Sequence, residues 1–105
     1  MQGSAIDRLR AMCGGPRDGA LLRVSIATAL LAQDDAAAAI GELRAALHFD
    51  PDYSVAWKLL GKALTGTGDA PAAIDAYRHG IAAALKRGDK QAEKEMAVFL
   101  RRLEK

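Results

Sequence analysis

The residues that could do chemistry are few and scattered in this sequence of 105 residues. His48 and His79 have no Cys, His or carboxylate cluster beside them at metal-site spacing, so we expect both at the surface. Cys13 lacks a paired His or Asn motif, and we expect a half-buried apolar residue there. Gly66 and Gly68 follow a helical pattern rather than a strand, so they lack the context of a phosphate-binding loop. The sequence therefore predicts no enzyme: no catalytic residue, no metal site and no cofactor.

The charge pattern gives little support for nucleic-acid binding. The net charge is only +2, and the basic residues gather toward the C-terminus. Glu93, Glu95 and Glu104 are interleaved with them, which is ordinary on an exposed helix. No aromatic residue alternates with the basic ones to stack bases. We therefore expect no nucleic-acid partner.

The cysteine count and the lengths of the apolar runs indicate a compartment. Cys13 is the only cysteine and cannot form an intrachain disulfide, so a reducing environment is the simpler expectation. No apolar run follows a basic start, and nothing approaches the roughly 18 consecutive apolar residues of a membrane span. We expect a cytoplasmic protein that does not bind membranes.

Composition and the positions of helix-breaking and capping residues predict an all-α chain in one domain. Half of the residues are hydrophobic, only 5% are aromatic and Ala is abundant, which favours close packing of helices. We expect one short helix within residues 1–15, and further helices at roughly 19–32, 35–48, 52–65, 69–87 and 89–104. The expected N-caps are Asp18, Asp34 or Asp35, Asp52, Asp69 and Asp89.

The stretch 57–81 carries the clearest packing pattern. Trp57, Leu60, Gly61 and Leu64 share one helix face, and Ala73, Tyr77, Gly80 and Ile81 share a face of the next helix. Small residues in both stripes let the two backbones approach closely, while Trp57 and Tyr77 fill the wider gaps. We expect a helical hairpin with both aromatic side chains in its core.

The pattern W-x-x-L-G-x-x-L, then a turn, then A-x-x-x-Y resembles the tetratricopeptide repeat, whose period is about 34 residues. A shift by one such period keeps side-chain size at most positions of the stretch 57–81. Gly61 falls on Ala27, and Tyr77 falls on Leu43. Trp57 is the clearest departure, since it falls on Arg23. The whole chain also resembles a group of short bacterial proteins with two such repeats.

The resemblance implies an all-α fold of the α-α superhelix type, a right-handed stack of helical hairpins with about six helices. It divides the single domain 1–105 into an N-terminal helix (1–15), repeat 1 (20–53), repeat 2 (54–87) and a C-terminal helix (88–105). That last helix carries an apolar stripe on one side and charges on the other, as a capping helix does at the end of a repeat stack.

The resemblance also implies a non-catalytic protein interaction module that binds a peptide or helix of a partner protein on the inner surface. The residues expected there are Leu21, Val24, Ser25, Thr28, Leu31, Val55, Lys58, Leu59, Lys62 and Thr65. Lys58 and Lys62 lie one turn apart above a mostly apolar floor, which suits an apolar segment with a carboxylate. The alternatives are that the last helix covers this surface, or that a second copy covers it in a homodimer.

Overall fold

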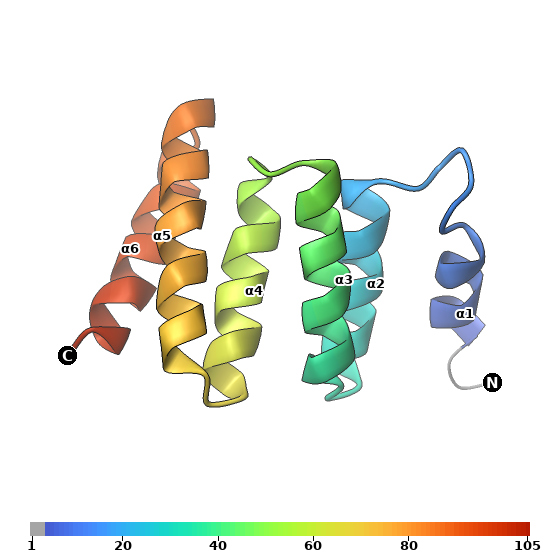
Figure 1. Ribbon diagram of the computed structural model, residues 1–105, viewed down its shortest axis with the longest axis horizontal. Helices are drawn as coiled ribbons and strands as arrows, with labels where there is room; N and C mark the ends of the chain where they lie inside the picture. Colours follow the sequence, from blue (N-terminus) through green and yellow to red (C-terminus); the bar gives the residue numbers. More distant parts are fainter. Residues whose placement is uncertain (1–3) are drawn as a thin grey trace.

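The computed structural model describes residues 4–105, which form six α-helices and no strand (Figure 1). The helices are α1 (Ser4–Ala11), α2 (Ala20–Ala32), α3 (Ala36–Phe49), α4 (Ser54–Gly66), α5 (Ala70–Arg87) and α6 (Lys90–Leu103). The predicted all-α class is confirmed. The predicted N-terminal helix spans only part of the range 1–15, whose first three residues lie outside the description.

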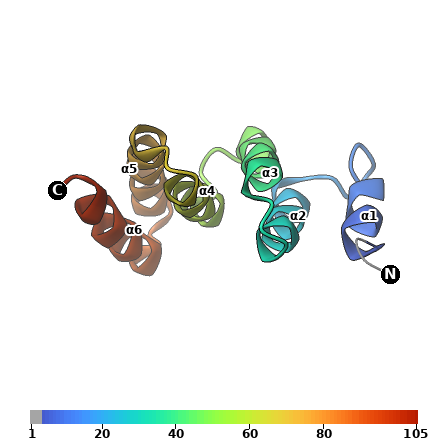
Figure 2. The same ribbon diagram turned by 90° about the horizontal axis from the view of Figure 1, so that it is seen from below.

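The six helices lie side by side in a row, with α1 and α6 at opposite ends (Figure 1). Helices α2 and α3 form one hairpin, and α4 and α5 form a second hairpin that packs on α3 through α4. Helix α6 packs mainly on α5 and also touches α4. The row measures 42 × 28 × 18 Å. Seen along the helices, α3 and α5 lie on one side of the row, while α2 and α6 lie on the other (Figure 2).

Three of the connections between helices have the same local structure. A residue with positive φ ends the first helix in each: Asp34 (60°), Gly68 (85°) and Gly88 (75°). An aspartate then caps the next helix, because the side chains of Asp35, Asp69 and Asp89 each accept a hydrogen bond from the backbone N–H three residues on. The predicted caps at these three positions are confirmed. Because this local structure recurs, the chain reverses direction in the same tight turn after α2, α4 and α5.

The predictions that Asp18 and Asp52 are N-caps are wrong. Helix α2 is preceded by Gly19 and helix α4 by Tyr53, and neither has a side-chain cap. The Asp18 carboxylate instead accepts hydrogen bonds from Arg23 and from the Gly14 backbone N–H. Asp52 forms an ion pair with Lys86. Both carboxylates have stronger partners than a helix terminus, since the partner in each pair is a full positive charge.

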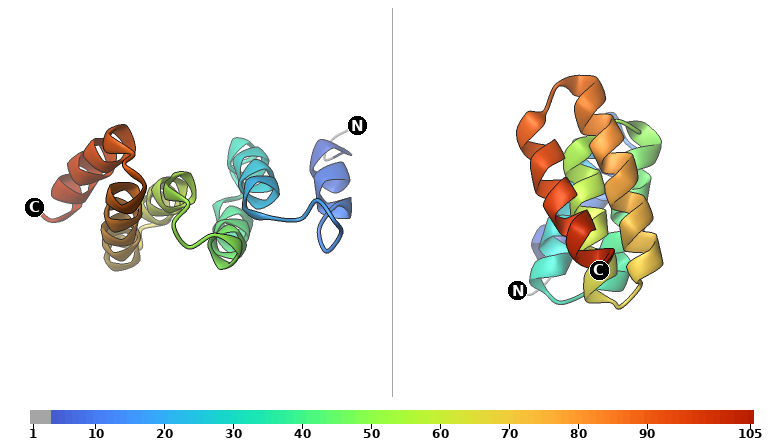
Figure 3. Two further views of the ribbon diagram at one scale, coloured as in Figure 1. Left: turned by 90° about the horizontal axis from the view of Figure 1, so that it is seen from above. Right: turned by 90° about the vertical axis from the view of Figure 1, so that its left-hand side faces the viewer.

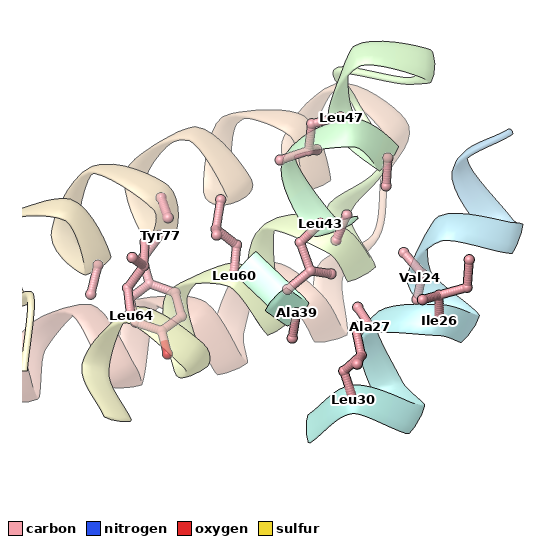
Figure 4. Packing of buried hydrophobic residues seen from close by; sticks show 14 of the residues in the cluster. Val24, Ile26, Ala27, Leu30, Ala39, Leu43, Leu47, Leu60, Leu64 and Tyr77 are labelled. Atoms are coloured by element: carbon pink, nitrogen blue, oxygen red, sulfur yellow. The ribbon is translucent and has the colours of Figure 1, made fainter. Parts of the chain in front are cut away.

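The core runs along the row as one continuous cluster of apolar side chains. Figure 4 shows its members from α2, α3 and α4, with Tyr77 of α5 beside Leu64. Tyr77 is 2% exposed, as predicted for a core residue. Burial raises the pKa of its phenol, so the hydroxyl is neutral at physiological pH. Trp57 is only partly buried, because it packs against the core from outside, and its prediction as a core residue is correct only in part.

Candidate functional site

The residues predicted for the inner surface of α2 differ in their exposure. Leu21 is 70% exposed, and Ser25 and Thr28 are also exposed, with their hydroxyl groups donating to backbone carbonyls one turn earlier. Leu31 is partly buried at the end of the helix. An exposed Leu beside two hydroxyl groups gives this half of the surface a mixed apolar and polar character.

Val24 does not belong to the accessible surface, contrary to the prediction. Only 7% of the residue is exposed, and it is a member of the apolar core (Figure 4). Its counterpart one repeat later, in the second hairpin, is Lys58, whose long side chain reaches Glu95 of α6 from the same register. A short isopropyl group at this register stays in the core, so a partner cannot reach it.

Helix α6 occupies part of the surface that α4 was predicted to offer. The Lys58 ammonium group lies 3.1 Å from a carboxylate oxygen of Glu95 in α6. The Lys62 ammonium group lies 5.1 Å from the ring centroid of Phe99, one turn further along α6. Val55 and Lys58 line a hollow of about 210 Å³ together with residues at the start of α6. Both lysines therefore contact the last helix on this side of α4.

The structure brings three of the predicted residues together in one pocket. Leu31 from α2 and Leu59 and Lys62 from α4 line a hollow of about 390 Å³. Asp34 also lines it, and Ala36, Ala63 and Gly66 complete the lining. The pocket thus has an apolar interior, one ammonium group and one carboxylate, and it joins the two hairpins near the turns that end α2 and α4.

A second hollow, of about 400 Å³, lies on the other side of the row and was not predicted. Its lining residues are Arg44, Leu47 and His48 from α3, Trp57, Leu60 and Leu64 from α4, and Ala72, Asp75 and Ala76 from α5. The Trp57 ring stacks on His79, with centroids 5.0 Å apart and planes 16° apart. We call this hollow the α3–α5 groove.

Sequence reasoning missed the α3–α5 groove although part of its signal was present. Arg44, Leu47 and His48 are spaced at i, i+3 and i+4, which places them on one face of α3. No local pattern showed that the face of α5 that carries Asp75 lies across the groove from this face of α3, since a whole helix separates α3 and α5 in the sequence. The stacking of Trp57 on His79 likewise depends on how α4 and α5 pair.

The remaining candidates for chemistry are dispersed. Within residues 4–105, no group of three or more His, Cys, Asp or Glu side chains is arranged to hold a metal ion. Cys13 is half-buried, and its thiol lies 4.0 Å from the Leu9 carbonyl oxygen. None of the helices within residues 4–105 has the length and apolar character needed to span a bilayer.

Comparison with known proteins gives consistent relatives. No protein-family model matches the chain. It is 45% identical over 100 residues to a TPR repeat-containing protein of Pseudomonas aeruginosa, an alignment that covers 95% of each chain. The solution structure of a protein from Bordetella parapertussis matches with a TM-score of 0.81 and 50% identity, over 98% of this chain and 89% of that one. A tetratricopeptide repeat domain protein from Salinibacter ruber matches with a TM-score of 0.78 and 28% identity, over 85% of this chain and 89% of that one.

Proposed function

The chain belongs to the tetratricopeptide repeat family, and from this membership we propose that it is a non-catalytic module that binds a peptide or helix of another protein on the side of the row formed by α2 and α4. The observation that carries the proposal is the pocket between the two hairpins. Leu31 and Leu59 give it an apolar interior, and Lys62 gives it a positive charge. A pocket built from two hairpins exists only when the hairpins stack, which fits a function that depends on the repeat.

The chemistry of the pocket defines the segment that would fill it. An apolar side chain of the partner would displace water from Leu31 and Leu59, and this desolvation would supply most of the affinity. A carboxylate one or two residues away would pair with Lys62 and fix the register of the segment. The Asp34 carboxylate on the pocket wall would disfavour a segment whose apolar residue is flanked by acidic residues on both sides.

Lys62 is better suited than Lys58 to bind a partner. Lys62 is exposed, and its contact with α6 is to the neutral ring of Phe99, whereas only 25% of the Lys58 side chain is exposed and its charge is paired with Glu95. A partner whose carboxylate paired with Lys58 would break the ion pair between Lys58 and Glu95. The binding surface we propose therefore centres on Leu31, Leu59 and Lys62, and α6 limits it on one side.

Self-association is a second candidate, favoured by the apolar exposure of the same side of the row. Leu21 is 70% exposed and Val55 is 37% exposed, and a second copy could cover both. Molar mass measured across a concentration series would decide, because a homodimer would double the mass as concentration rises. A constant monomer mass would leave the partner-binding candidate alone.

Two variants test the proposed pocket without disturbing the core. In Gly66→Leu the new side chain would fill the pocket, and a Cβ atom at Gly66 meets no atom within 4 Å, so the fold has room for it. Lys62→Glu would reverse the charge at the rim. The matched controls are Gly41→Leu, where a Cβ atom also meets nothing within 4 Å, and Lys94→Glu on the exposed side of α6. Neither control residue lines the pocket.

The expected result is that immobilised wild type and both controls retain the same protein from a cell extract, while Gly66→Leu and Lys62→Glu lose it. Circular dichroism of each variant would verify the helical content. Retention of that protein by all four variants would show that the pocket is not the binding site and would overturn the proposal.

A further inference from the structure

We propose a second interaction surface on the opposite side of the row: the α3–α5 groove binds an amphipathic helix that carries acidic residues on one flank and basic residues on the other. Helices α3 and α5 both pack on α4 and do not contact each other within the described chain, so α4 is the floor and the other two helices are the walls. Figure 2 and the left view of Figure 3 show α3 and α5 on the same side of the row with α4 set back between them.

The floor of the groove is apolar and belongs to the core. Leu60 and Leu64 of α4 are each 4% exposed, and Leu47 of α3 is 9% exposed. The α5 wall is built from small residues, since Ala72 and Ala76 both line the groove. Small side chains on a wall allow the backbone of an incoming helix to approach closely, and close approach increases the apolar area removed from water.

The spacing of the lining residues favours a helix over an extended strand. The floor residues Trp57, Leu60 and Leu64 span two helical turns of α4, a length of about 10 Å. The lining residues of α3 and of α5 each recur at i, i+3 and i+4. A partner helix with apolar residues at i, i+3, i+4 and i+7 presents a ridge of the same length, which is the pairing that ridges-into-grooves packing requires.

The two walls carry opposite charges that are available to a partner. Arg44 on α3 is exposed and forms no ion pair with the residues that the structure describes. The Asp75 side chain on α5 is 72% exposed, and within residues 4–105 its carboxylate pairs only with His79, at 3.5 Å, which is an ion pair only when that imidazole is protonated. A helix with an acidic flank toward Arg44 and a basic flank toward Asp75 would form ion pairs with both walls.

Trp57 marks one end of the groove and provides a direct signal of occupancy. Its indole N–H donates to the Pro51 carbonyl oxygen at 2.7 Å, and its ring stacks on His79. The chain contains one tryptophan, so the tryptophan emission comes from a residue that lines this groove. A helix lying on Leu60 and Leu64 would cover the exposed edge of the indole and shift its emission to shorter wavelength.

The test uses the full chain and two synthetic helical peptides of about 18 residues, long enough to hold some helix alone. Both peptides carry the same Leu ridge over two turns. The charged peptide has Glu on one flank and Lys on the other, and the neutral peptide has Gln at all of those positions. Titration followed by Trp57 emission should show that the charged peptide binds about three- to tenfold more tightly, as expected for two exposed ion pairs.

Three variants decide whether the binding belongs to this groove. Arg44→Gln with Asp75→Asn should remove the preference for the charged peptide and leave the affinity for the neutral peptide unchanged. Ala72→Leu should weaken both peptides at least about tenfold by filling the groove wall, whereas its control Ala82→Leu, an exposed position on the same helix outside the groove, should weaken neither. Gly66→Leu, on the opposite side of the row, should also bind both peptides normally.

Several results would overturn the proposal. The first is no change in Trp57 emission at about 1 mM of either peptide. The second is equal affinity of the wild type for the two peptides. The third is loss of peptide binding in Gly66→Leu with retention in Ala72→Leu, which would place the peptide on the α2–α4 side.

Discussion

Gly61 of α4 faces the ring of Tyr77 of α5 so closely that no Cβ atom fits between them. A Cβ atom built at Gly61 would lie 2.6 Å from Cζ and 2.7 Å from Cδ1 of that ring. The equivalent pair in the first hairpin, one repeat earlier, is Ala27 and Leu43, and both residues are fully buried. In each pair the smaller residue lies on the first helix and the larger on the second, so the combined side-chain size is similar in the two hairpins.

We expect Gly61→Ala to destabilise the protein by about 1–3 kcal/mol, the typical effect of overpacking. Alanine favours the helix by up to about 1 kcal/mol over glycine, so any net loss must come from the contact with Tyr77. Urea unfolding followed by circular dichroism measures the change. Adding Tyr77→Leu to Gly61→Ala recreates the pair of the first hairpin and should recover part of the stability. Wild-type stability in Gly61→Ala would show that the new contact with Tyr77 costs no more than the roughly 1 kcal/mol that alanine gains in helix propensity, which would contradict the prediction.

Gly41→Ala serves as the matched substitution and should have the opposite effect. Gly41 lies inside α3, is exposed, and a Cβ atom there meets nothing within 4 Å. We expect stabilisation by about 0.5–1 kcal/mol, because alanine loses less backbone entropy than glycine in a helix. The same urea experiment checks it, and a lower midpoint than that of the wild type would contradict the prediction.

Much of the fold could be predicted because its signals are local or strictly periodic. The apolar spacing identifies the helices, and the shift by one repeat period pairs Gly61 with Ala27 and Tyr77 with Leu43. The caps at Asp35, Asp69 and Asp89 follow breaks in the apolar pattern. Such features depend on residues within one or two turns, which the sequence displays directly.

The candidate site was less predictable because it depends on which faces meet across the row. The register of Val24 predicts the inner surface, as it does for Lys58, but a short apolar side chain at that register is buried. The pairing of Lys58 with Glu95 joins residues 37 positions apart through the angle at which α6 returns. Asp18 and Asp52 have the residue type of a cap but are bound by arginine and lysine, respectively. Charge pairing across distant elements has no periodic signature.

The Lys58–Glu95 ion pair predicts a charge-reversal experiment on the docking of α6. Lys58→Glu would bring two carboxylates together where the structure has 3.1 Å between opposite charges. Since 42% of the Glu95 side chain is exposed, solvent screening limits the expected loss to about 0.5–1 kcal/mol. Lys58→Glu with Glu95→Lys should restore most of it. Urea midpoints of the wild type, Lys58→Glu, Glu95→Lys and the double variant complete a double-mutant cycle.

Salt provides the control for this cycle. The coupling between positions 58 and 95 should shrink as ionic strength rises to about 1 M, because screening weakens interactions between exposed charges. A coupling that is zero at low salt, or one that does not change with salt, would show that the ion pair does not hold α6 against α4.

Asp18 predicts how stability depends on pH. Its carboxylate accepts hydrogen bonds from Arg23 at 2.9 Å to each oxygen and from the Gly14 N–H at 2.7 Å. The Arg23 guanidinium, followed by the Gly14 N–H, lowers the pKa of Asp18 well below its ordinary range. Arg23 also bonds Glu42 of α3, so this cluster ties the turn after α1 to the first hairpin.

A lowered folded-state pKa fixes the sign of the effect. The Asp18 carboxylate stabilises the folded state fully above the unfolded pKa of about 3.9, and this contribution is lost progressively as the pH falls below that value. Asp18→Asn should therefore lower the urea midpoint at pH 7 and should lose less on acidification than the wild type does. Some acid sensitivity will remain, because hydrogen bonds from Arg87 also lower the pKa of Asp50. If acidification lowered the urea midpoints of both proteins equally, the ionised Asp18 carboxylate would not stabilise the contact of the α1–α2 turn with the first hairpin.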